Sequence, residues 1–148
     1  LSMGYPEAGE EAKIIRQHGR DDAWTRFGPV VGSEEIRSWQ AGLDTVELHP
    51  DIVDYVVSCL RQTRQAPEVL MGASPRTGVK ISRLARALAL LRGRDYVSID
   101  LVKEIFLPAV AHRLIMQDPA RAPAPLLEQV LRTVPVPESR GRRSPGGP

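Results

Sequence analysis

The stretch SPRTGVKISRLARALALLRG, residues 74–93, predicts one long helix with its own start and stop signals. Ser74 suits the N-cap, and Pro75 suits the first helical position, where its missing N–H leaves no hydrogen bond unmade. Gly93 is the expected end, because glycine readily takes the left-handed backbone that closes a helix. Apolar residues at helical spacing predict an inward face. That face comprises Ile81, Leu84, Leu88 and Leu91.

The first turn of this helix carries a cation, Arg76, at the end where the helix dipole disfavours one. An exposed cation at that end costs about 0.3–1 kcal/mol relative to an acid. An anion bound there would meet the dipole, the unpaired backbone N–H groups and the guanidinium together. Arg76 is therefore a candidate anion ligand.

Basic residues continue along the same segment, with no acidic residue between Glu68 and Asp95. Arg76, Lys80 and Arg83 are four and three residues apart, so they share one helical face. For Lys80, Arg83 and Arg86 a solvated face opposite the leucines is the simpler interpretation, and a phosphate-binding face is the alternative. The whole basic set comprises Arg76, Lys80, Arg83, Arg86, Arg92 and Arg94.

The rest of the chain also predicts helices, so the expected fold class is all-α, a compact helical bundle. Aromatic residues make up only 5% of the chain, and the abundance of Leu, Ala and Arg favours helices over sheets. In the predicted helix 50–65, the apolar stripe should comprise Val53, Val56, Val57 and Leu60. Pro108 should kink or interrupt a later helix. The further helices are predicted over residues 6–18, 33–43, 50–65, 99–114 and 125–133.

Two connections lack helical periodicity. Residues 20–32 contain glycine and proline breakers, which predicts a loop, with Trp24 and Phe27 packed on the core. Residues 46–48 alternate in polarity and predict a short extended connection.

The expected domain organisation has three parts. Residues 1–6 are the end of a linker, residues 7–133 form a helical domain, and residues 134–148 form a flexible tail. The tail is expected to be disordered because it is rich in Pro, Gly and Arg and has little to bury.

Composition excludes several classes of protein. The chain has 148 residues, room for one domain with a hydrophobic core, and its 42% of hydrophobic residues is too high for disorder throughout. A net charge of +2 is too small by itself to argue for a nucleic-acid partner. The longest apolar run, residues 87–91, is far short of the roughly 20 residues that cross a bilayer. A single cysteine excludes an intramolecular disulfide, and a cytoplasmic protein is expected.

Common catalytic motifs are missing from the chain. No glycine is followed by lysine, so a phosphate-binding loop of the Walker type is absent. His18, His49 and His112 are far apart in sequence, and no metal site is expected. Cys59 lies near the apolar side of its predicted helix, where a buried structural thiol is expected rather than a nucleophile.

Several segments carry a resemblance to a known family. The run GASPRTGVKISRLARALALLRGRDYVSIDLV, residues 72–102, resembles the signature of the lid subdomain of MoxR-type AAA+ ATPases. DYVVSCLRQTR, residues 54–64, resembles the family's helix that ends in Thr-Arg, and residues 111–114 resemble its later His-Arg pair. GYPEAGEEAKII, residues 4–15, resembles the segment after the last strand of the ATPase core. Two residues depart from the pattern, Leu101 in place of an acid and Lys80 in place of a small or apolar residue.

The resemblance implies a role for the helix start. Arg76 would be the sensor 2 arginine, which reaches the γ-phosphate of ATP bound in a core domain of the same chain, with Ser74, Pro75 and Lys80 beside the nucleotide. ATP and Mg²⁺ would be the cofactors of a parent ATPase whose core lies before Leu1. The present chain, without Walker A and Walker B motifs, would be catalytically inert and would hold neither cofactor tightly.

The resemblance also implies partners. They would be the protein's own AAA+ core, neighbouring subunits of a ring that is often a hexamer, and proteins with von Willebrand factor A domains. The parent would be a chaperone-like machine in which hydrolysis is coupled to movement of the lid.

Two alternatives come from other functional classes. A basic helical module would bind nucleic acid through its phosphates, using residues 76–94 and the arginines of the tail. A plain protein-interaction domain would use its helix faces as docking surfaces. The scarcity of aromatic residues, the small net charge and the 18 acidic residues argue against the first alternative, so no nucleic-acid partner is expected.

Overall fold

The computed structural model describes residues 4–17 and 27–137. The chain divides into two units, Leu1–Ile36 and Arg37–Pro148, which are described separately below. The predicted contacts of Trp24 and most of the predicted tail lie outside the described residues.

The first unit contains helix α1, Ala8–Gln17, whose first turn is acidic and whose last turn carries Arg16. This charge order favours a helix because it complements the helix dipole. Helix α2, Ser33–Gly42, begins in this unit and has no buried residue. Both helices were predicted. The Phe27 side chain is 73% exposed, and its packing on the core, which lies in the second unit, stays a prediction.

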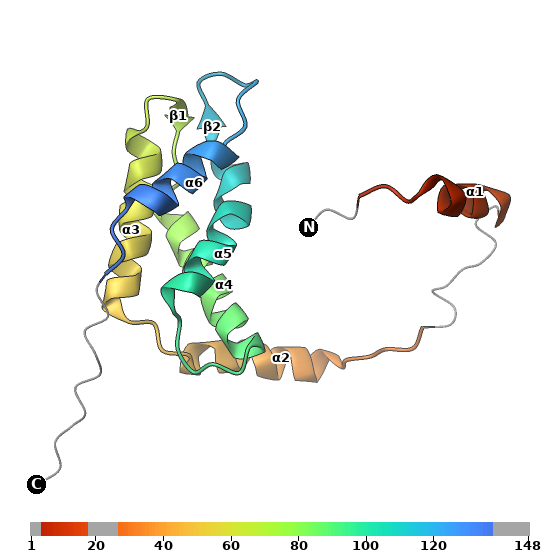
Figure 1. Cartoon of the computed structure of the whole chain (residues 1–148). Coiled ribbons are helices and arrows are strands. Elements are labelled where there is room, and N and C mark those ends of the chain that lie inside the picture. Colours follow the sequence, from red (N-terminus) through yellow and green to blue (C-terminus); the bar gives the residue numbers. More distant parts are fainter. Residues whose placement is uncertain (1–3, 18–26, 138–148) are drawn as a thin grey trace, which may run out of the picture. The chain divides into compact units, whose positions relative to one another are not determined.

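The second unit is a bundle of four helices (Figure 1). Helix α4 packs against both α3 and α5, and α6 packs across α3 and α5. Two short 3₁₀ helices, η2 and η3, precede α3 and follow α5. The predicted all-α class is therefore confirmed. The elements are η2 (Leu43–Thr45), α3 (Pro50–Gln65), α4 (Pro75–Leu91), α5 (Ile99–Val110), η3 (Ala111–Arg113) and α6 (Ala124–Thr133).

Two very short strands join the connections at one end of this bundle (Figure 1). Strand β1, Val69–Met71, pairs antiparallel with β2, Ile115–Met116, and Val69 lies opposite Met116. The sequence did not predict them, because strands of two or three residues are too short to show a period of two. The predicted extended connection at 46–48 is confirmed: the Glu47 N–H donates to the Asp95 carbonyl at 2.8 Å, and the Glu47 carbonyl accepts from Val97 at 2.9 Å.

Helix ends follow the local sequence signals closely. His49 is the N-cap of α3, and its Nδ1 accepts a hydrogen bond from the Asp51 N–H at 3.2 Å. Gly93 follows α4 with a positive φ of 66°, which only glycine adopts readily. Pro108 lies within α5, and the helix ends two residues later and gives way to η3. The predicted interruption of the helix 99–114 is thus observed.

The inward faces of α3 and α4 differ in part from the prediction. On α4, Ile81 is buried, whereas Leu84 is 47% exposed and Leu91 is 81% exposed. Small side chains occupy the core positions that were predicted for these leucines. Helix α4 lies between α3 and α5, and close packing of the three helices needs small residues there. The buried residues of α4 are Thr77, Ile81, Ala85 and Ala89.

Helix α3 shows a similar correction. Val56 and Leu60 are buried as predicted, but Val53 and Val57 are exposed. Cys59 is fully buried, in agreement with a structural thiol. Val134, the first residue of the predicted tail, follows α6 and is also buried in the core. The buried residues of α3 are Ile52, Tyr55, Val56, Cys59, Leu60 and Thr63.

Candidate functional site

The candidate site is the N-terminus of α4. Ser74 occupies the N-cap position with extended backbone, at φ −79° and ψ 164°, and Pro75 is the first helical residue. The Ser74 hydroxyl makes no capping hydrogen bond to the backbone and lies 3.5 Å from the hydroxyl of Thr77. The predicted cap position is correct, but no side-chain acceptor meets the helix start. Pro75 has no N–H and the Thr77 N–H donates to the Ser74 carbonyl at 2.9 Å, so the Arg76 N–H and the dipole behind it are the elements of an anion site among the described residues.

Arg76 lies in this first turn, and its side chain is exposed. Among the residues that the structure describes, it has no ion pair and no side-chain hydrogen bond. Lys80, one turn further along α4, is also exposed and unpaired within the same residues. The structure therefore brings together all four predicted site residues, Ser74, Pro75, Arg76 and Lys80, within the first two turns of α4.

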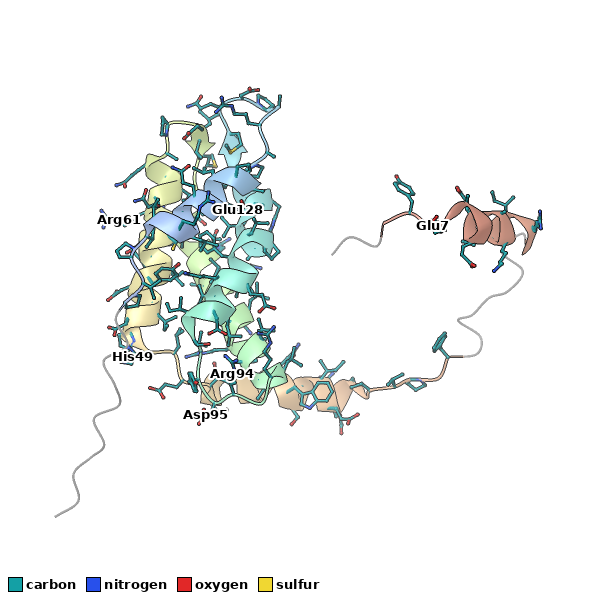
Figure 2. All side chains as sticks on the ribbon, in the orientation of Figure 1. Glu7, His49, Arg61, Arg94, Asp95 and Glu128 are labelled. Atoms are coloured by element: carbon teal, nitrogen blue, oxygen red, sulfur yellow. The ribbon has the colours of Figure 1, made fainter. Side chains whose placement is uncertain are left out.

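The six basic residues predicted as one segment fall into two groups. Arg86 pairs with Asp44 at 3.5 Å, Arg92 with Glu104 at 2.7 Å, and Arg94 with Asp100 at 3.1 Å. Figure 2 labels Arg94 and Asp95 in the turn between α4 and α5. Only the other three, Arg76, Lys80 and Arg83, lack an acidic partner among the described residues. Half of the cations of this segment are therefore already paired with carboxylates.

The segment before α4 is tied to the last turn of α3. The N–H of Ala73 donates to the Thr63 hydroxyl at 3.1 Å, and that hydroxyl donates to the Leu60 carbonyl at 2.7 Å. The Arg64 Nε–H donates to the Ala73 carbonyl at 2.9 Å. Both backbone polar groups of Ala73, a fully buried residue, are thus held by consecutive side chains of α3. Sequence reasoning missed this contact, although Thr63-Arg64 and residues 72–76 were both recognised as family-like.

Two glycines allow the backbones to approach at this point. A Cβ on Gly72 would lie 2.6 Å from Cγ, 2.7 Å from Cα and 2.8 Å from the backbone N of Arg64. A Cβ on Gly78 would lie 3.1 Å from a methyl group of Leu60. Gly72 therefore meets backbone atoms that cannot move independently, whereas Gly78 meets the flexible end of a side chain. The glycine that opens the motif is required by this close approach.

An open apolar groove of about 660 Å³ runs between α3 and α4, beside Pro75. The exposed valines Val53, Val57 and Val79 line it, together with Arg61 and Arg64, and no acidic residue does. Arg61 projects outward from α3 in Figure 2. The valines that periodicity assigned to the core therefore form the wall of a surface groove.

Two buried titratable groups lie on α3, and a third group with a shifted pKa lies at the start of α5. Burial raises the pKa of the Cys59 thiol to about 11, so it stays protonated at neutral pH and is a poor nucleophile. Burial also raises the pKa of Tyr55, whose hydroxyl has no hydrogen-bond partner among the described residues. At the start of α5, hydrogen bonds from Ser98 and then Arg94 lower the pKa of the Asp100 carboxyl.

Neither a metal cluster nor a membrane-spanning helix is found in the described part of the chain. No three His, Cys, Asp or Glu side chains there are grouped to hold a metal ion. His49 caps α3, His112 lies exposed in η3, and His18 is outside the described residues. No helix over residues 4–17 and 27–137 is long and apolar enough to cross a membrane.

Comparisons with known proteins match the segment that forms this site. The family model for the AAA lid domain matches residues 61–134, from the end of α3 through α6. Chaperone MoxR1 of Mycobacterium tuberculosis is 32% identical over 151 residues, covering 93% of this chain and 40% of that protein. YeaC of Bacillus subtilis, an uncharacterised protein, is 29% identical over 134 residues, covering 90% of this chain and 42% of that protein.

The fold has a counterpart among solved structures. A crystal structure of a provisionally assigned ATPase from Cytophaga hutchinsonii superposes with a TM-score of 0.77 at 20% identity, covering 92% of this chain and 45% of that one. The chain spans about two fifths of the length of the curated relatives it matches, 42% and 40%. The matched segment contains the tie between α3 and α4 together with the helix start that bears Arg76. The chain therefore belongs to the AAA lid domain family, and its likeness to MoxR1 identifies it as a lid of the MoxR type.

Proposed function

We propose that this chain acts as the lid of an AAA+ ATPase and that Arg76 is its sensor 2 residue. In this role the Arg76 guanidinium contacts the γ-phosphate of ATP bound by a core domain of the same protein. The observation that carries the proposal is an exposed arginine, unpaired among the described residues, in the first turn of a helix whose cap hydroxyl does not bond the backbone. A phosphate at that position gains both the guanidinium and the helix dipole.

The residues present fit a phosphate group better than a metal ion. Arg76 and Lys80 supply positive charge, and Ser74 and Pro75 line the approach to the first turn. No acidic cluster occurs among the described residues, so Mg²⁺ would be held by the core. When bound, MgATP supplies the phosphoryl group that is transferred to water, and fixed cations around the γ-phosphate stabilise the charge of that transfer. Arg76 would provide one of these cations.

Arg76 would also make the lid responsive to the nucleotide. Its contact exists only while the γ-phosphate is present, so hydrolysis and release would remove an interaction between lid and core. Movement of the lid on that loss would be a hinge motion, the reverse of the closure that many proteins undergo around a bound ligand. In the whole protein this motion would drive a chaperone-like ring, in a hexamer with neighbouring subunits and with von Willebrand factor A domain proteins as partners, in a cytoplasmic setting.

The test is ATP hydrolysis by the full-length protein. Arg76→Ala should lower kcat by about 10²-fold, the scale seen when one preorganised charge donor is removed from a transition state. Lys80→Ala should have a milder effect. Arg83→Ala is the matched control, because Arg83 is equally exposed and unpaired among the described residues but lies two turns from the helix start. Hydrolysis by Arg76→Ala at the wild-type rate would refute the assignment.

A further inference from the structure

We infer that Thr63 and Arg64 are positioning residues for Arg76, an inference that rests on the proposed function. Neither side chain needs to touch nucleotide for this role. They act through Ala73, the buried residue three positions before Arg76, whose N–H and carbonyl they hold at 3.1 Å and 2.9 Å. We call these two hydrogen bonds the α3 clamp.

The clamp fixes the direction in which α4 begins. A single hydrogen bond would fix only one of the two peptide groups that flank the Ala73 Cα. Because the N–H and the carbonyl of Ala73 belong to different peptide groups, the two bonds fix the orientation of both. Thr63 is itself held, because it is fully buried and its hydroxyl donates to the Leu60 carbonyl at 2.7 Å. The clamp therefore transfers the rigidity of α3 to the segment that leads into α4.

The backbone between the clamp and Arg76 has little conformational freedom. Only Ser74 and Pro75 intervene, and the proline ring restricts its own φ to about −65°. Proline also biases the residue before it toward extended backbone, which is the conformation of Ser74. The clamp thus constrains the position of the Arg76 Cα relative to α3, and the close approach of Gly72 to the Arg64 backbone adds a second constraint.

This arrangement matters because a cation stabilises a transition state only when it is held in place beforehand. Misplacement of a catalytic group by about 1 Å can cost up to 10²-fold in rate. Arg76 is exposed, and among the described residues no partner holds its guanidinium, so its backbone is the part that the lid itself can position. A purely structural role for Thr63 and Arg64 is the alternative, and it predicts loss of stability without any special link to Arg76.

The experiment uses the full-length protein and steady-state ATP hydrolysis. Thr63→Val removes the hydroxyl at nearly constant shape, Thr63→Ser restores it, and Arg64→Met removes the Nε donor at similar length. Arg61→Met is the matched control, since Arg61 lies one turn earlier on α3 and has no partner among the described residues. We expect Thr63→Val and Arg64→Met to lower kcat about tenfold, with a smaller change in KM for ATP. Thr63→Ser and Arg61→Met should stay close to wild type.

A double variant separates positioning from general damage. If Thr63 acts through Arg76, then adding Thr63→Val to Arg76→Ala should lower kcat no further. A multiplicative loss in the double variant would overturn the inference, as would wild-type kcat in both Thr63→Val and Arg64→Met. If Thr63→Val does not fold, Arg64→Met in the same cycle decides the question, because it removes an exposed side chain.

Failure of the inference can be told from failure of the proposed function. If Arg76→Ala hydrolyses ATP normally, the sensor assignment is wrong and the positioning role falls with it. If Arg76→Ala is slow while the clamp variants are normal, only the positioning role is wrong. Amide hydrogen exchange gives an independent readout: exchange at Ala73 should rise at least about tenfold in Thr63→Val and remain unchanged in Arg61→Met. Unchanged exchange at Ala73 in Thr63→Val would show that the clamp does not hold this segment and would overturn the inference.

Discussion

Substitution of Gly72 by alanine should destabilise this chain strongly, although it adds only one methyl group. The new Cβ would lie 2.6–2.8 Å from Cγ, Cα and N of Arg64, and two of these atoms belong to the backbone of α3. Overpacking that shifts backbone costs about 1–3 kcal/mol. Separation of the two segments would also weaken the hydrogen bonds from Thr63 and Arg64 to Ala73, each worth about 0.5–1.5 kcal/mol.

The expected loss in the free energy of unfolding is therefore about 2–4 kcal/mol, which corresponds to a fall in Tm of roughly 10–20 °C for a domain of this size. Thermal melts followed by circular dichroism measure it. Gly78→Ala is the matched control. Its Cβ meets a movable methyl group of Leu60 at 3.1 Å, and the gain of about 1 kcal/mol in helix propensity offsets the cost of that contact, so its Tm should change little. A Gly72→Ala melt within about 2 °C of wild type would refute the close-approach argument.

Three further outcomes are expected. Cys59 should resist a thiol reagent at pH 8 in the native protein and react fully after denaturation, because burial raises its pKa to about 11; rapid native reaction would contradict its buried position. The carboxyl of Asp100 should titrate below the usual aspartate range by NMR, and Ser98→Ala should raise its pKa. Because the folded-state pKa is lowered, the stability that this group contributes is present above the unfolded pKa and is lost as the pH falls through the folded pKa, a loss absent in Asp100→Asn. Finally, fluorescence anisotropy at physiological salt should detect no submicromolar binding to duplex or single-stranded nucleic acid, since few unpaired cations cluster on α4.

The sequence alone was sufficient to predict the helices and most of their ends. Each of the signals that predict them depends only on residues that are close in sequence, so it does not need information about tertiary packing. Examples are the Ser74-Pro75 start and the Gly93 end of α4. The position of Arg76 in the first turn follows from the same local signals. These signals were enough to predict both the fold class and the candidate anion site.

Only the tertiary structure decided which face of each helix is buried and which cations remain unpaired. Leu84 and Leu91 are more apolar than Ala85 and Ala89, yet the alanines are buried because α4 lies between α3 and α5, where little room is left. Arg86 meets Asp44, 42 residues away, and Arg92 meets Glu104, 12 residues away. The clamp on Ala73 likewise joins α3 to a segment nine and ten residues further on. Periodicity describes one helix at a time, whereas burial and pairing depend on the neighbour that packs against it.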